Sequence, residues 1–81
     1  MRTILKFYSP SCAPCKALST RLSQLGVKTQ DIDVTEESVS ILLHTYGVKA
    51  VPTLVKIEEG KPTTTMTGYS SQEELSKFLE A

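Results

Sequence analysis

The succession of a strand, a helix and a second strand in the first half of the chain most constrains its fold. Residues 3–8, TILKFY, are apolar, aromatic and β-branched, and Ser9-Pro10 ends them, so they predict a strand. Residues 13–25 follow with leucines at i, i+4 and i+7, which predicts a helix. Residues 27–34, VKTQDIDV, predict a second strand. Because strand–helix–strand crossovers are right-handed, the two strands are expected to lie parallel in one sheet.

The second half of the chain predicts a helix, a hairpin and a last helix. Residues 35–46 form the helix, which ends at Gly47, and its expected apolar face comprises Val39, Leu42, Leu43 and Tyr46. Residues 50–68 alternate about an EEGK turn and predict the hairpin. Residues 71–81 begin with a capping box from Ser71 to Glu74. The predicted fold is therefore α/β, in the order β-α-β-α-β-β-α, with three helices flanking a four-stranded mixed sheet.

Size and charge restrict what the chain can do. The 81 residues predict one domain, residues 1–81, with a small core. Lysine plus arginine balances aspartate plus glutamate without a basic block, which argues against nucleic acid as a partner. The apolar runs are too short for a membrane span, and the first residues lack a signal peptide. We therefore expect a cytoplasmic protein, and a monomer because no exposed apolar stripe stands out.

The two cysteines, Cys12 and Cys15, lie together where the first strand meets the first helix. Such a pair serves thiol–disulfide exchange, half of a metal site, or a structural bridge. A zinc site needs four ligands, and the chain adds only His44 and carboxylates, so no metal is expected within one chain. A cluster shared between two chains stays open. Since a bridge closing so short a loop constrains the unfolded chain little, exchange is favoured.

The position of each cysteine predicts its role. Cys12 lies at the helix N-terminus, where free N–H groups and the dipole favour an anion, and such sites lower a cysteine pKa from about 8.5 to roughly 3.5–7.5. Cys12 is therefore expected to attack a disulfide as the thiolate. Cys15, one turn on and more buried, is expected to resolve the mixed disulfide. Lys16 adds positive potential, and Pro14 stiffens the turn.

Two segments of the sequence resemble the thioredoxin family. Residues 7–16, FYSPSCAPCK, resemble the active-site segment, usually aromatic-x-x-x-Cys-Gly-Pro-Cys-Lys. Residues 46–80, which begin YGVKAVPTLVKIEEGK, resemble the second half of thioredoxins. The resemblance implies the minimal thioredoxin fold shared with glutaredoxins, a redox-active Cys12–Cys15 disulfide and no bound cofactor.

The resemblance also implies a substrate-binding surface. Pro52 matches the family's cis-proline, which faces the dithiol, and a cis bond there would expose backbone groups of Val51 to an extended substrate segment. Gly68 matches a glycine that lets a partner approach closely. The other residues implied at this surface are Tyr8, Pro10, Ser11, Ala13 and Pro14.

Three positions depart from the family pattern. Ala13 replaces the usual glycine, Ser11 stands where thioredoxins often have tryptophan, and Lys6 occupies the place of a buried acid that helps deprotonate the resolving cysteine. If Lys6 points toward Cys15, its ammonium would favour the thiolate; if it points to solvent, it has no special role. In either case the proton of the resolving thiol must go to water or another group.

The function indicated is that of a small dithiol–disulfide oxidoreductase that reduces protein disulfides. The resemblance implies a flavoprotein reductase that uses NADPH, or else glutathione, as its source of electrons, and ribonucleotide reductase as a possible client. A glutaredoxin-like, glutathione-dependent reductase is one alternative, although residues 50–52, Ala-Val-Pro, and residues 67–72, TGYSSQ, lack the usual glutathione signature. A thioredoxin-fold docking module with an incidental dithiol is the other.

Overall fold

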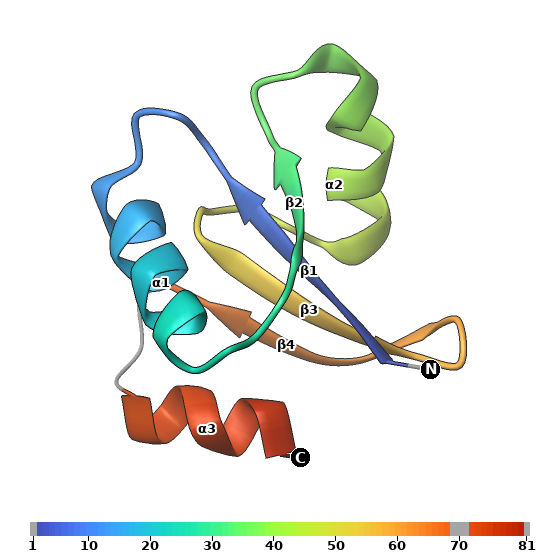
Figure 1. The fold of residues 1–81 in the computed structure, drawn as a ribbon. Helices are drawn as coiled ribbons and strands as arrows, with labels where there is room; N and C mark the ends of the chain where they lie inside the picture. Colours follow the sequence, from blue (N-terminus) through green and yellow to red (C-terminus); the bar gives the residue numbers. More distant parts are fainter. Residues whose placement is uncertain (1, 69–71, 81) are drawn as a thin grey trace.

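Helices cover both faces of a four-stranded sheet in the computed structural model, which describes residues 2–68 and 72–80 (Figure 1). The elements, in chain order, are β1 (Arg2–Tyr8), α1 (Ala13–Gln24), β2 (Gln30–Asp33), the 3₁₀ turn η1 (Glu37–Val39), α2 (Ser40–Tyr46), β3 (Thr53–Glu58), β4 (Lys61–Thr67) and α3 (Gln72–Glu80). This order confirms the predicted β-α-β-α-β-β-α arrangement.

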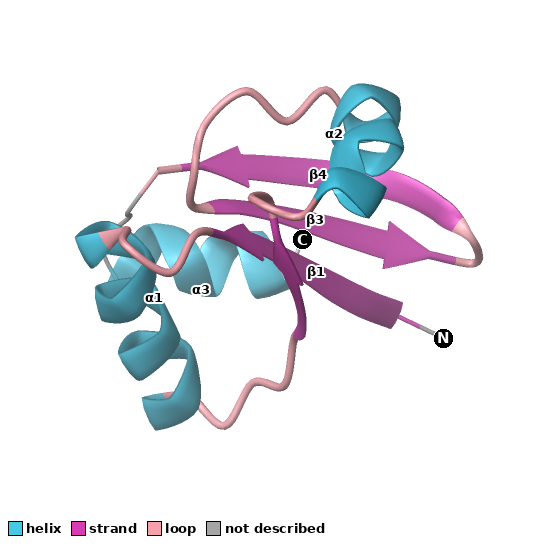
Figure 2. Ribbon diagram, turned by 90° about the horizontal axis from the view of Figure 1, so that it is seen from above, coloured by secondary structure: helices cyan, strands magenta, loops and turns pink. Residues whose placement is uncertain are grey.

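The sheet is mixed, as the crossover argument predicts. Its strand order is β2-β1-β3-β4, with β1 parallel to β2 and antiparallel to β3, and β3 antiparallel to β4. Figure 2 shows α2 on one face of the sheet and α1 with α3 on the other. Strand β1 therefore lies inside the sheet, and its C-terminal end leads directly into the loop that carries the cysteines.

Several element boundaries differ from the sequence-based prediction. Strand β2 covers only Gln30–Asp33 and so begins later than the predicted residue 27. It ends one residue early because the chain turns after Asp33, whose Oδ1 accepts hydrogen bonds from the backbone N–H and the hydroxyl of Thr35. The α-helix expected from Thr35 begins at Ser40, after the 3₁₀ turn. Helix α1 ends one residue early, at Gln24. The capping box at Ser71 lies outside the described residues.

Two apolar clusters hold the layers together. The cluster on the α1 and α3 side contains Ile4, Leu18, Leu22, Leu54, Leu75 and Phe78. The cluster on the α2 side contains Leu5, Phe7 and Val55, against which Ile32, Val34, Leu43, Tyr46, Val48 and Ile57 pack. Side chains alternate across β1 because a strand has a period of two, so Lys6 points to the same side as Ile4. Leu42, expected on the apolar face of α2, is instead exposed.

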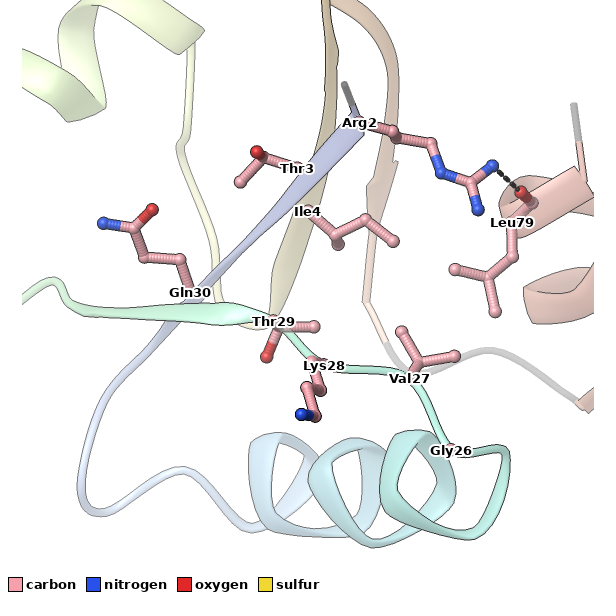
Figure 3. A pocket seen from close by; sticks show the side chains of 9 residues that line it. All are labelled: Arg2, Thr3, Ile4, Gly26, Val27, Lys28, Thr29, Gln30 and Leu79. Carbon is pink, nitrogen blue, oxygen red and sulfur yellow. Dashed lines mark hydrogen bonds between the residues drawn. The ribbon is translucent and has the colours of Figure 1, made fainter.

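Two cationic side chains from the sheet donate hydrogen bonds to backbone carbonyl oxygens in the last turn of α3. The buried Lys56 Nζ donates to the carbonyl oxygen of Phe78 at 2.7 Å and lies 5.4 Å from the centre of its ring. Arg2 Nη1 donates to the carbonyl oxygen of Leu79, also at 2.7 Å (Figure 3). The last carbonyls of a helix lack partners within it and carry partial negative charge, so both cations stabilise the helix end.

Replacing Arg2 tests the exposed member of this pair of contacts. Arg2→Met removes a charged donor from a helix C-terminus and is expected to lower the free energy of unfolding by about 0.3–1 kcal/mol. Urea unfolding followed by circular dichroism measures the change. Lys28→Met removes an exposed cation that borders the same cavity as Arg2 and is the matched control. An equal loss in both variants would contradict the helix-end contact.

Candidate active site

Cys12 and Cys15 form a disulfide at the start of α1, with their Cα atoms 5.2 Å apart. The turn after β1 brings them there, since the backbone N–H of Cys12 donates to the carbonyl oxygen of Ser9 at 3.2 Å. Pro14 lies in the first helical turn, where a missing N–H costs nothing. The local sequence therefore places one sulfur at the helix end and the other one turn inside.

The N-terminus of α1 provides a hydrogen-bond donor to the sulfur of Cys12. Cys12 is the N-cap residue, and its Sγ accepts a hydrogen bond from the backbone N–H of Cys15 at 3.1 Å. A thiolate accepts such a bond more strongly than a neutral sulfur does, and the helix dipole adds to the effect. Reduction of the disulfide thus leaves Cys12 where its charged form is favoured.

The second sulfur is enclosed. Cys15 is only 2% exposed, whereas Cys12 is half-buried. Cys15 borders a cavity of about 340 Å³ between α1, the C-terminal half of β1 and Asp31 of β2. The lining residues are Lys6, Tyr8, Ser9, Pro10, Cys15, Lys16, Ser19 and Asp31. A bulky protein disulfide can therefore approach Cys12 more readily than Cys15.

The sheet register brings three of the expected surface residues into one row. Phe7 pairs with Thr53, and Thr53 pairs with Thr67, so the next residues along, Tyr8, Pro52 and Gly68, meet at the ends of their strands. The backbone N–H of Gly68 donates to the carbonyl oxygen of Pro52 at 2.8 Å. The Val51–Pro52 bond is cis, as the family resemblance implies, and Gly68 has a φ of 87°, which favours glycine.

The remaining expected residues surround the dithiol on the outer side. Pro10 and Ser11 form the exposed turn before Cys12, and Ala13, Pro14 and Lys16 are exposed on the first turns of α1. Val51 is half-buried beside Pro52. Thus every residue selected from the sequence lies on β1, the cysteine loop, α1 or the adjoining strand ends.

Lys6 points inward, which resolves the orientation that the sequence left open. Its side chain is 7% exposed, and Nζ donates a hydrogen bond to Ser19 Oγ, one turn beyond Cys15 on α1. Nζ also lies 3.4 Å from Asp31 Oδ1 and 5.9 Å from the centre of the Tyr8 ring. The ammonium therefore occupies the same cavity as Cys15.

Asp31 is the residue that the sequence reasoning missed. It lies beside Lys6 because β1 and β2 are parallel neighbours, with Lys6 opposite Asp31 in the register. Its side chain is 50% exposed and borders the Cys15 cavity. Pairing the two predicted strands would have offered a signal, but their register depends on which faces are buried in the packed sheet, and neither strand sequence alone shows that.

A second cavity, of about 460 Å³, lies at the opposite end of β1. Figure 3 shows its lining, which includes Arg2, Lys28, Thr29 and Leu79 but no cysteine.

Within residues 2–68 and 72–80, no group of three or more histidine, cysteine or acidic side chains is placed to hold a metal ion. None of the described helices is long and apolar enough to cross a membrane.

A half-buried sulfur at a helix start, joined to an enclosed sulfur one turn further, forms and breaks a disulfide reversibly. That arrangement defines a thiol–disulfide oxidoreductase.

Comparison with known proteins agrees with this class. The thioredoxin family model matches residues 1–81, and the chain belongs to the thioredoxin family. It is 30% identical over 79 residues to thioredoxin of Bacillus subtilis (strain 168), covering 90% of this chain and 74% of that protein. It is 32% identical over 79 residues to the SPbeta prophage-derived thioredoxin-like protein YosR of the same organism, covering 94% and 96%.

A solved structure supports the same fold. A mutant thioredoxin from Halobacterium salinarum NRC-1 superposes with a TM-score of 0.83 at 29% identity, over 98% of this chain and 72% of that one. The predicted thioredoxin fold is therefore confirmed. Members of the family carry electrons in the cysteine pair itself, need no bound cofactor, and work with a reductase and with disulfide-containing clients.

Proposed function

We propose that this protein reduces the disulfides of other proteins in the cytoplasm, acting as a monomer, with Cys12 attacking and Cys15 resolving. The observation that carries the assignment of roles is the contrast between the two sulfurs. Cys12 is half-buried at the helix start, whereas Cys15 is 2% exposed behind it. Attack on a client requires a sulfur that the client can reach, whereas the resolving sulfur attacks Cys12 within the same protein and needs no access from outside.

The proposed cycle conserves atoms and electrons. The Cys12 thiolate attacks one sulfur of a client disulfide, so that a mixed disulfide forms and the other client sulfur leaves as a thiolate. The thiol of Cys15 then loses its proton and attacks Cys12 Sγ, which restores the Cys12–Cys15 disulfide and releases the second client thiolate. Two electrons pass from the protein to the client, and a reductase returns them.

The client-binding surface that we propose lies at the strand ends beside the cysteine loop. The backbone of Val51 would pair with an extended client segment, and Gly68, which lacks a β-carbon, would allow close approach. An apolar cavity of about 220 Å³ adjoins Val51 and would hold a client side chain. Its lining residues are Val34, Leu43, Val48, Lys49, Ala50 and Val51.

Reduction of insulin tests the function. Wild-type protein is expected to accelerate the precipitation of insulin chains by dithiothreitol, and Cys12→Ser is expected to give the uncatalysed rate because the attacking sulfur is gone. Circular dichroism of the variant shows whether the fold is kept. Binding of insulin without acceleration by the wild type would indicate a docking module instead.

The same assay identifies the source of electrons when dithiothreitol is replaced. We propose a flavoprotein reductase that uses NADPH, and the loss of NADPH absorbance with thioredoxin reductase present is the expected result. Consumption only with glutathione and glutathione reductase would indicate the glutaredoxin-like alternative. Ribonucleotide reductase is the client that we propose to examine first.

A further inference from the structure

The resolving step needs a proton acceptor that β1 does not provide. Cys15 must lose its proton before its sulfur can attack, because the thiolate is the nucleophile. Lys6 of β1 borders the same cavity as Cys15, and its ammonium has protons to donate and no lone pair to accept one. The enclosed position of Cys15 also separates it from bulk water.

Asp31 is the carboxylate that borders the same cavity. Its Oδ1 accepts a hydrogen bond from Thr29 Oγ1 at 2.6 Å and lies 3.4 Å from Lys6 Nζ. Both contacts use Oδ1, which leaves Oδ2 to accept a proton. The Lys6 contact is itself held in place, since Nζ also donates to Ser19 Oγ on the helix that carries Cys15. Lys6 therefore fixes the carboxylate against the cavity from the sheet side.

We propose that Asp31 accepts the proton of the Cys15 thiol in the resolving step, and that Lys6 positions Asp31 and stabilises the resulting thiolate. This inference rests on the proposed function. The S–H bond of Cys15 breaks, its proton passes to the Asp31 carboxylate, and the sulfur attacks Cys12 Sγ. The bond from Cys12 to the client sulfur breaks, and that sulfur leaves with the electron pair and takes up a proton from Asp31 or solvent.

The cavity allows such a transfer. A volume of about 340 Å³ exceeds the roughly 30 Å³ that one water takes in the liquid, so water can link the thiol to the carboxylate. Asp31, half exposed, can then return the proton to solvent. The charged and titratable groups around Cys15 in this cavity are Lys6 and Tyr8 from β1, Lys16 from α1 and Asp31 from β2.

Rapid mixing of the reduced protein with excess dithiobisnitrobenzoate separates the two steps. Cys12 releases the first nitrothiobenzoate, and Cys15 releases the second in a phase whose rate does not depend on the reagent concentration. Cys15→Ser identifies that phase by abolishing it. Absence of the first phase in the wild type would refute the proposed function, whereas the second phase alone tests the role of Asp31.

Asp31→Asn is expected to slow the second phase at least about tenfold at neutral pH, since a positioned base contributes roughly 10²–10⁴-fold and water remains as a poorer acceptor. Asp31→Glu, which keeps a carboxylate, is expected to recover most of the rate. Asp33→Asn is the matched control: it removes the same charge from the same strand outside the cavity, and the amide oxygen can still accept from Thr35.

The sign of the effect distinguishes a proton acceptor from a simple counter-ion. Removing a negative charge near Cys15 favours its thiolate and lowers its pKa, so a counter-ion alone predicts an unchanged or faster second phase in Asp31→Asn. Either of those results would overturn the proposal. The pKa of Cys15 is measured from the ultraviolet absorption of its thiolate in a Cys12→Ser background, in which Cys15 titrates alone.

Lys6→Met tests the positioning residue. Removing one member of a fully buried ion pair is destabilising because the partner charge is left uncompensated, but Asp31 is 50% exposed and water can solvate its carboxylate. The variant is therefore expected to fold, and circular dichroism checks that it does. Loss of the ammonium removes a cation from the cavity, which is expected to raise the pKa of Cys15 in the Cys12→Ser background and to slow the second phase. An unchanged pKa and an unchanged rate together would refute the role of Lys6.

Discussion

A Cys15→Ser variant, incubated with oxidised insulin, is expected to accumulate as a covalent adduct with its client. The variant keeps Cys12 at the helix start, with the Cys12 sulfur hydrogen-bonded by the backbone N–H of residue 15, so that attack proceeds. No second sulfur remains to release the client, and turnover therefore stops at the mixed disulfide. Non-reducing gel electrophoresis measures the adduct as a band that dithiothreitol removes.

Cys12→Ser is the control, because it is expected to form no covalent adduct with insulin. It leaves only the enclosed Cys15, which is 2% exposed, and no adduct is expected within the same time. The two variants differ only in which sulfur is lost, so they compare attack with resolution directly. A stable adduct with Cys12→Ser and none with Cys15→Ser would reverse the assigned roles of the two cysteines.

The largest expected loss of stability follows from Phe7→Ala. Phe7 is 0% exposed in the α2-side cluster, where its ring lies 6.2 Å from that of Tyr46. Truncation of a buried phenylalanine costs about 3–5 kcal/mol, because apolar contacts are lost and a cavity remains. A chain of 81 residues has a total stability of roughly 4–12 kcal/mol. The variant is therefore expected to lose a large fraction of its total stability and to unfold at a clearly lower urea concentration.

Urea unfolding of the reduced and oxidised forms measures this loss. Ile41→Ala is the matched control, since it removes an apolar side chain from α2, the helix on the same side of the sheet, at a position that is 75% exposed. It is expected to change stability by about 0.5 kcal/mol or less. A loss below about 1 kcal/mol in Phe7→Ala would mean that the α2 layer packs less tightly than the structure shows.

The cysteine loop shows how much of the site can be read from local sequence. A strand, a turn at Ser9-Pro10 and a helix with Pro14 in its first turn are all short-range features, and together they place Cys12 at a helix N-terminus. The order of the strands and helices can be predicted in the same way, because each element has its own hydrophobic periodicity and is ended by turn residues such as glycine and proline. The ends of the elements depend on side-chain contacts as well: the hydrogen bonds that Asp33 Oδ1 accepts from Thr35 end β2 one residue before the predicted residue 34.

Lys6 illustrates the part that the sequence leaves undecided. A lysine in the middle of an apolar strand is compatible with either face, and local pattern does not choose between them. The packed structure chooses, since the alternation of β1 between two cores turns Lys6 toward α1, where Ser19 and Asp31 provide partners that make its burial tolerable. Asp31 borders the Cys15 cavity for a similar reason, because the register of β1 and β2 places it opposite Lys6.

By itself, then, the sequence determined the order of the elements, the cysteine pair and the position of Cys12 at a helix start, because short-range forces between neighbouring residues set all three. Only the tertiary structure decided that Lys6 is buried, that Asp31 lies beside it, and that Tyr8, Pro52 and Gly68 form one row. Those contacts join residues from different strands, and their geometry depends on register and layer packing, which no single segment encodes.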